Sequence, residues 1–75
     1  IDRTVIEQVS GVIIDEQDAY GEVAMSQASI AELLGASRQA VNEALRELKA
    51  MGAVETAYRR ISILDAVVLA GVASR

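Results

Sequence analysis

Apolar residues recur at helical spacing in two neighbouring segments near the middle of the chain, on either side of Gly35. Residues 27–34 and residues 38–51 each carry apolar side chains at the spacing of one helical face. These positions are Ile30, Ala31, Leu33 and Leu34 in the first segment, and Val41, Ala44, Leu45 and Leu48 in the second. Ser26 and Ser37 directly precede the segments, at the position where serine hydroxyls cap helices. The pattern therefore predicts two helices joined by a tight turn.

The turn between the two predicted helices has the spacing of a helix-turn-helix. Ala31 is small enough to let the helices approach each other, and Gly35 tolerates the positive φ that a sharp turn requires. Val41 and Leu45 are then placed to hold the second helix against the first. In DNA-binding proteins with this motif the second helix lies in the major groove. The spacing therefore makes double-stranded DNA the first candidate ligand.

The residues before this pair are predicted to form a helix, a turn and a short strand. Residues 2–16 are amphipathic, and one face carries Val5, Ile6, Val9, Val12 and Ile13. Residues 17–22 are a polar turn that contains Gly21. The segment GEVAM, residues 21–25, predicts a strand of three or four residues.

After Gly52 the hydrophobic period changes from helical to alternating. Residues 53–57 and 61–64 are predicted to form a β-hairpin, with Tyr58, Arg59 and Arg60 in the turn. A last helix over 66–73 is predicted, capped by Asp65 and packed through Val67, Val68, Leu69 and Val72. A hairpin after a helix-turn-helix is a wing. Residues 1–75 are therefore expected to form one domain, mainly α with a small β-hairpin: a winged helix-turn-helix with a three-helix core plus the wing.

The composition excludes several classes of function. The 75 residues suffice for one small domain, and they include no cysteine and no histidine. A disulfide scaffold, a zinc finger, a thiol nucleophile and a histidine-based triad are thereby excluded. Because the chain has no glycine-rich phosphate loop and no paired carboxylates on one face, we do not expect an enzyme. The absence of cysteine fits a cytoplasmic protein, which is the location we expect. No apolar run reaches the about 20 residues that span a bilayer, so we expect no membrane partner.

The charge is unevenly distributed along the chain. The net charge is −4, but the acids are concentrated in residues 1–37 and the bases in residues 38–75. Most of the bases lie on the second predicted helix or just after it, namely Arg38, Arg46, Lys49, Arg59 and Arg60. Such a local basic face is the electrostatic requirement of a nucleic-acid site. The acidic total keeps a second hypothesis open, a winged-helix module that binds protein and has little affinity for DNA.

The candidate DNA-binding residues lie at the starts of both central helices, on the outer face of the second helix and at the wing tip. They are Ser26, Gln27, Ser37, Arg38, Gln39, Asn42, Glu43, Arg46, Lys49, Arg59 and Arg60. All but Glu43 can donate hydrogen bonds to phosphates or base edges. Arg38, at the start of its helix, is expected to reach a base, whereas Lys49 near the far end reaches a phosphate. Arg59 and Arg60 are expected to contact phosphates, the alternative being that they only keep the hairpin tip soluble.

Three stretches resemble the C-terminal DNA-binding domain of the cyclic-AMP receptor protein/FNR (Crp/Fnr) family of bacterial transcriptional regulators. They are MSQASIAELLGASRQAVNEALREL, KAMGAVE and RRISILD, and they cover about residues 25–65. The resemblance implies a winged helix-turn-helix, a homodimeric full-length protein and RNA polymerase as a further partner. It also implies an upstream β-barrel domain that binds a cyclic nucleotide or another effector, and no cofactor in residues 1–75. Because the sequence begins with Ile1, we expect it to be a fragment of such a regulator.

The resemblance also assigns the residue that reads a base. In that family a Ser-Arg pair opens the recognition helix and the arginine reads guanine; here the pair is Ser37–Arg38. Many members carry arginine where this chain has Glu43, which can only accept from cytosine N4 or position a neighbouring arginine. A helix-surface pair of Glu43 with Arg46 is the alternative. The segment VNEALREL also looks like the GntR family, a second winged-helix assignment.

Overall fold

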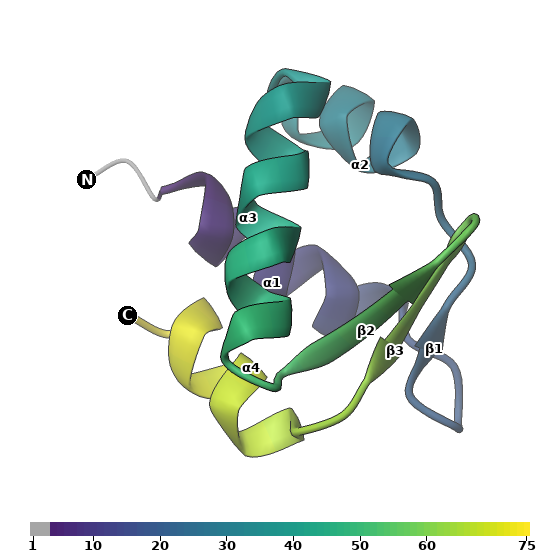
Figure 1. Ribbon diagram of the computed structural model, residues 1–75, viewed down its shortest axis with the longest axis vertical. Helices are drawn as coiled ribbons and strands as arrows, with labels where there is room; N and C mark the ends of the chain where they lie inside the picture. The colour runs from purple at the N-terminus through teal and green to yellow at the C-terminus, as the bar shows by residue number, and fades with distance from the viewer. Residues whose placement is uncertain (1–3) are drawn as a thin grey trace.

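Four helices and a small antiparallel sheet form the structure, a computed structural model that describes residues 4–75 (Figure 1). The helices are α1 (Val5–Glu16), α2 (Gln27–Leu34), α3 (Arg38–Ala50) and α4 (Ala66–Ala73). The strands are β1 (Glu22–Val23), β2 (Val54–Ala57) and β3 (Arg60–Ile63). The fold is thus the winged helix-turn-helix that the hydrophobic pattern predicts. Asp2 and Arg3, which were included in the first predicted helix, lie outside the described residues.

A side-chain cap marks the start of each helix. Thr4 and Glu7 form a capping box at α1, in which each side chain accepts a hydrogen bond from the other residue's backbone N–H. The hydroxyls of Ser26 and Ser37 each accept from the N–H three residues on, at 3.1 and 3.0 Å. The carboxylate of Asp65 accepts from two N–H groups of α4, both at 3.1 Å. The three caps predicted from the sequence are therefore confirmed.

The turn between α2 and α3 has the predicted helix-turn-helix geometry. Gly35 adopts φ +66° at the end of α2, in the left-handed region that glycine enters without steric cost. Ala31 on α2 is buried, as are Val41 and Leu45 on α3. These side chains hold the two helices together, so the start of α3 is fixed relative to α2.

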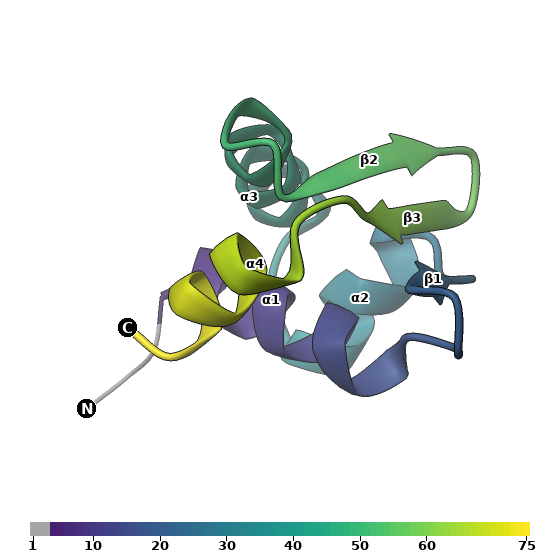
Figure 2. The same ribbon diagram turned by 90° about the horizontal axis from the view of Figure 1, so that it is seen from below.

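The hydrophobic core lies between the four helices and the inner face of the sheet (Figure 2). Its fully buried large side chains are Val9, Ile13, Val23, Ile30, Val41, Leu45, Leu48, Val54 and Leu69. Two predicted packing residues are not part of it, since Leu33 is 60% exposed and Val67 is 83% exposed. Both lie on eight-residue helices that bury only one face, and each side chain lies more than a quarter turn around the helix axis from the middle of that face. No helix in residues 4–75 is long and apolar enough to cross a membrane.

The wing is a three-stranded sheet rather than the predicted two-stranded hairpin. Strands β2 and β3 pair antiparallel, and β1 pairs with the other edge of β3 to give the order β1-β3-β2. The strand expected within residues 21–25 is present, but it has only two residues. The first hairpin strand ends at Ala57 as predicted, but the second begins and ends one residue earlier than predicted. Arg60 therefore pairs with Ala57, and the turn consists of Tyr58 and Arg59 alone.

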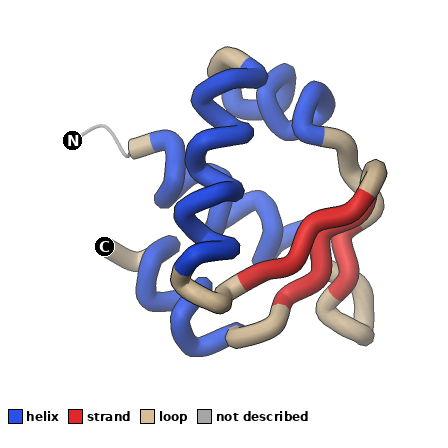
Figure 3. The backbone as a smooth tube through the Cα atoms, in the orientation of Figure 1, coloured by secondary structure: helices blue, strands red, loops and turns tan. Residues whose placement is uncertain are grey.

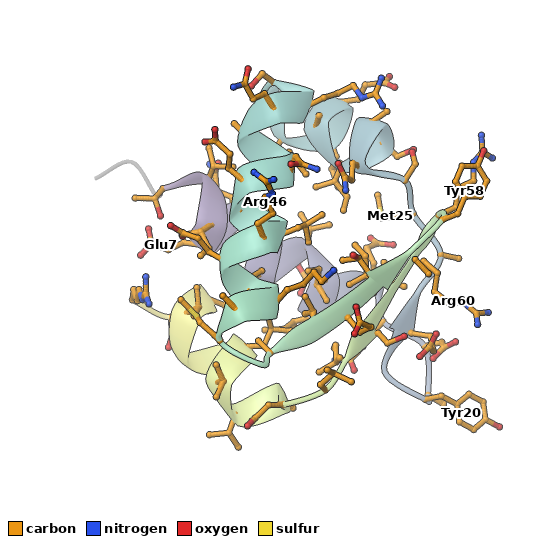
Figure 4. The ribbon with its side chains drawn as sticks, viewed as in Figure 1. Glu7, Tyr20, Met25, Arg46, Tyr58 and Arg60 are labelled. Atoms are coloured by element: carbon orange, nitrogen blue, oxygen red, sulfur yellow. The ribbon has the colours of Figure 1, made fainter. Side chains whose placement is uncertain are left out.

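The polar turn between α1 and β1 is organised by Asp18. Its side chain accepts hydrogen bonds from the backbone N–H groups of Tyr20 and Glu22, at 2.8 and 3.1 Å. This is the local side-chain-to-backbone bonding that favours aspartate in turns. Tyr20 stands at the outer end of the turn and is 88% exposed (Figure 4). The turn predicted over residues 17–22 is therefore present, but it ends at Gly21, because Glu22 begins β1.

Candidate nucleic-acid interface

One face of α3 is buried and the other carries most of the candidate residues. Val41, Ala44, Leu45 and Leu48 face the core. The side chains on the outer face are all exposed, and they are Arg38, Gln39, Asn42, Glu43, Arg46 and Lys49. Figure 4 shows Arg46 on the side of α3 that is turned away from the other helices. The outer face predicted from the helical period is thus present and open to a ligand.

The outer face of α3 has a basic edge and an acidic edge. Successive residues advance by about 100° around a helix, which places Arg38, Asn42 and Lys49 toward α2 and the sheet. Glu43 and Glu47 lie on the opposite edge, where they border a shallow hollow beside α1. Within residues 4–75 the ion pairs do not include Glu43 with Arg46, so that pair, considered from the sequence, is not formed. The carboxylates are thus separated from Arg38, Asn42 and Lys49.

A hydrogen bond between side chains ties α3 to α2. The amide nitrogen of Asn42 donates to the amide oxygen of Gln27 at 3.0 Å. The bond fixes the side chain of Asn42 on the exposed face of α3 relative to the first turn of α2. The sequence singled out both residues but did not reveal that they act together.

Two of the candidate cations are held by carboxylates. The ammonium of Lys49 lies 3.5 Å from Oε1 of Glu55 on β2, and Nε of Arg60 lies 3.3 Å from Oε1 of Glu22 on β1. That oxygen of Glu22 is buried and has no hydrogen bond of good geometry, so Arg60 is its charge partner. Lys49, Glu55 and Arg60 are largely exposed, and ion pairs of this kind contribute little to stability. Sequence reasoning missed Glu22 and Glu55, because these pairs depend on the register of the sheet.

A groove of about 320 Å³ runs between the start of α2, the start of α3 and the tip of the wing. Its rim is formed by Ser26, Gln27, Arg38, Tyr58 and Arg59, and none of the described residues that line it is acidic. The first turn of α2 adds backbone N–H groups that have no partner within the helix and favour an anion. The groove therefore combines two arginines with a helix N-terminus, so its local potential favours an anionic ligand.

The predicted site residues divide into three groups. Ser26, Gln27, Arg38 and Arg59 gather around the groove, and Asn42 joins them through Gln27. Gln39, Arg46 and Lys49 extend the surface along α3, and Ser37 caps that helix. Glu43 and Arg60 lie apart, because Glu43 is on the acidic edge and Arg60 is on β3 beside Glu22. Tyr58 was assigned only to the hairpin turn, yet it forms part of the rim.

The sequence matches known proteins over most of its length. The family model of the Crp-like helix-turn-helix domain matches residues 5–72. The HTH-type transcriptional regulator Mce2R of Mycobacterium tuberculosis is 42% identical over 55 residues, which are 73% of this chain and 23% of that protein. An uncharacterized HTH-type transcriptional regulator of Mycobacterium bovis matches equally well. This chain therefore spans about a quarter of the length of these relatives.

The fold is also similar to solved structures. A CRP family transcriptional regulator from Thermus thermophilus superposes with a TM-score of 0.85 at 24% identity, covering 99% of this chain and 42% of that one. The reduced CO-sensing protein of R. rubrum has a TM-score of 0.82 at 26% identity, covering 91% of this chain and 35% of that one. The part of each protein that matches is the winged helix-turn-helix described above.

Proposed function

This chain belongs to the Crp-like helix-turn-helix domain family, and we propose that it binds double-stranded DNA by placing α3 in the major groove, as the DNA-binding domain of a bacterial transcriptional regulator. Of the two winged-helix families that the sequence resembles, the Crp-like one is the family whose model matches. Within this proposal Arg38 reads a base, and the other candidate residues position the domain on the backbone.

The observation that carries this proposal is the continuity between α3 and the groove. The exposed donors of α3 run without interruption into the groove formed by Arg38, Arg59 and the start of α2. A helix in the major groove needs base-reading donors on its outer face and anion-binding groups beside it for the neighbouring backbone. The elements that carry these groups are α3, the start of α2 and the wing tip; residues of all three line one groove, and Figures 1 and 3 show how their backbones surround it.

The assembly of the whole regulator is part of the same proposal. In a homodimer, two copies of α3 would meet half-sites about 34 Å apart on one face of the duplex. The matched regulators are longer than this chain, which supports an upstream domain that binds a cyclic nucleotide or another effector. The proposal includes a cytoplasmic location and a contact with RNA polymerase, as expected of a transcriptional regulator.

The salt dependence of DNA binding tests this proposal. Displacement of counterions by three phosphate contacts lowers the affinity about 40-fold between about 50 and about 200 mM salt. We expect such a decrease when this domain is titrated with a duplex selected from a random library. If no duplex binds at the lower salt concentration, the domain is a protein-interaction module instead. The acidic total charge of −4 is the feature that favours this second function.

The ion pair of Lys49 with Glu55 allows a test, in the same assay, of whether Lys49 contacts a phosphate. Lys49→Ala should weaken binding to all duplexes alike and flatten the salt dependence by about one ion. Glu55→Gln should strengthen binding to all duplexes, because the ammonium of Lys49 then has no carboxylate that competes with phosphate. Both variants are titrated on two unrelated duplexes at two salt concentrations. The control is the double variant that combines Glu55→Gln with Lys49→Ala. If Glu55→Gln still raises the affinity when Lys49 is already alanine, Glu55 repels DNA directly.

A further inference from the structure

The tip of the wing carries a stacked pair of side chains that base reading by α3 does not use. Tyr58 is 89% exposed, and the guanidinium carbon of Arg59 lies 5.5 Å from the centre of its ring. A cation above an aromatic face is held by the ring's quadrupole, and the stack keeps the guanidinium close to the ring. The pair projects beyond the sheet at the end of the hairpin, where Figure 4 shows Tyr58.

The backbone at Arg59 is in a conformation that an arginine adopts only at a cost. Its φ is +53°, and it is the only residue other than glycine with a positive φ in residues 4–75. Such a conformation costs a residue with a Cβ about 1 kcal/mol or more, whereas glycine adopts it freely. Backbone strain of this kind concentrates at functional sites. The turn thus presents a guanidinium at a position where glycine would fit more easily.

The groove sets where this tip lies relative to DNA. The groove is lined by Arg38 from the start of α3 and by Tyr58 and Arg59 from the wing tip. If α3 occupies the major groove, the sugar-phosphate backbone that borders it passes through this groove. The duplex surface on the other side of that backbone is the adjacent minor groove. The wing tip therefore faces the minor groove. A single sugar-phosphate backbone separates it from the bases that Arg38 contacts.

We propose that Arg59, stacked on Tyr58, enters this minor groove and makes the domain prefer A·T base pairs beside its half-site. Runs of A·T pairs narrow the minor groove and strengthen its negative potential, which attracts arginine. The proposal rests on the major-groove position of α3. It assigns Arg59 a part in sequence preference rather than the phosphate contact expected from the sequence. Arg60 differs, because Glu22 holds its Nε beside the sheet.

Selection from a random duplex library tests this proposal with the wild-type domain, Arg59→Gly and Arg60→Ala. We expect the wild type to enrich a core motif with A·T pairs on the wing side, preferred over G·C pairs by about fivefold or more. Arg59→Gly should keep the core motif and lose the A·T preference. Because glycine suits φ +53°, this variant should be at least as stable as the wild type, so its loss cannot arise from unfolding. Arg60→Ala should leave the A·T preference unchanged, because Glu22 holds Arg60 away from the groove.

Replacing the flanking A·T pairs by inosine·cytosine identifies the groove that is read. Inosine lacks the exocyclic amino group of guanine, so an I·C pair resembles A·T in the minor groove but G·C in the major groove. The wild type should bind the I·C flank as it binds A·T. Two results would overturn the minor-groove role of Arg59. One is that the wild type binds the I·C flank as weakly as it binds the G·C flank, and the other is that Arg59→Gly keeps the A·T preference. A core motif without any flank preference would contradict this inference alone, whereas failure to enrich any motif would contradict the proposed function.

Discussion

Leu45→Ala should lower the free energy of unfolding by about 2–5 kcal/mol. Leu45 is 2% exposed and lies on the buried face of α3 near Val41. It also borders the groove together with Ile61 of β3, so it supports α3 against both α2 and the wing. Truncation leaves a cavity that a domain of 75 residues can fill only by shifting these elements. Urea denaturation followed by circular dichroism measures the change.

Leu33→Ala is the matched control for this prediction. It removes the same atoms from the neighbouring helix α2, but Leu33 is 60% exposed. We expect its effect on the free energy of unfolding to stay within about 0.5 kcal/mol. If the two variants were equally stable, α3 would not pack through Leu45 as the structure has it.

Arg38→Ala should reduce affinity for the preferred duplex by about 1–3 kcal/mol and relax the preference at one base pair. Arg38 is the first residue of α3, it is exposed, and the cap at Ser37 fixes the start of the helix. The N-terminal residues of a recognition helix contact the base edges, and a guanidinium can hold guanine through two parallel hydrogen bonds. Titration on the preferred duplex and on a scrambled one measures both effects.

Arg38→Lys separates charge from geometry at the same position. Lysine keeps the positive charge but lacks the planar fork that bonds guanine twice. This variant should therefore retain most of its affinity for the scrambled duplex and lose discrimination. If Arg38→Ala instead loses the same free energy on both duplexes, Arg38 contacts only phosphate.

The helix-turn-helix was predictable because its determinants are local. Ser26, Gly35 and Ser37 act on residues within one helical turn, and the helical period places the outer face of α3. The burial of individual side chains on α4 was less predictable. Its sequence, AVVLAGVA, is apolar on all sides, so no period distinguishes exposed Val67 from buried Leu69.

The parts of the candidate site that depend on long-range pairing could not be predicted. A strand of two residues has no period, so nothing in the sequence indicates that Glu22 and Val23 pair with β3. A shift of one residue in the hairpin moves Arg60 from the turn into the strand and toward Glu22. Arg59 and Arg60 look equivalent in the sequence, and only the structure shows that their surroundings differ.

A substitution at a single atom of the DNA tests most directly whether α3 reads the major groove. In the selected site each guanine is replaced in turn by 7-deazaguanine, which lacks the N7 acceptor on the major-groove edge. The wild-type domain should lose affinity by about 1–3 kcal/mol at one guanine, and Arg38→Ala should lose nothing further there. A loss that is equal in both proteins, or the absence of any sensitive guanine, would contradict direct reading by Arg38.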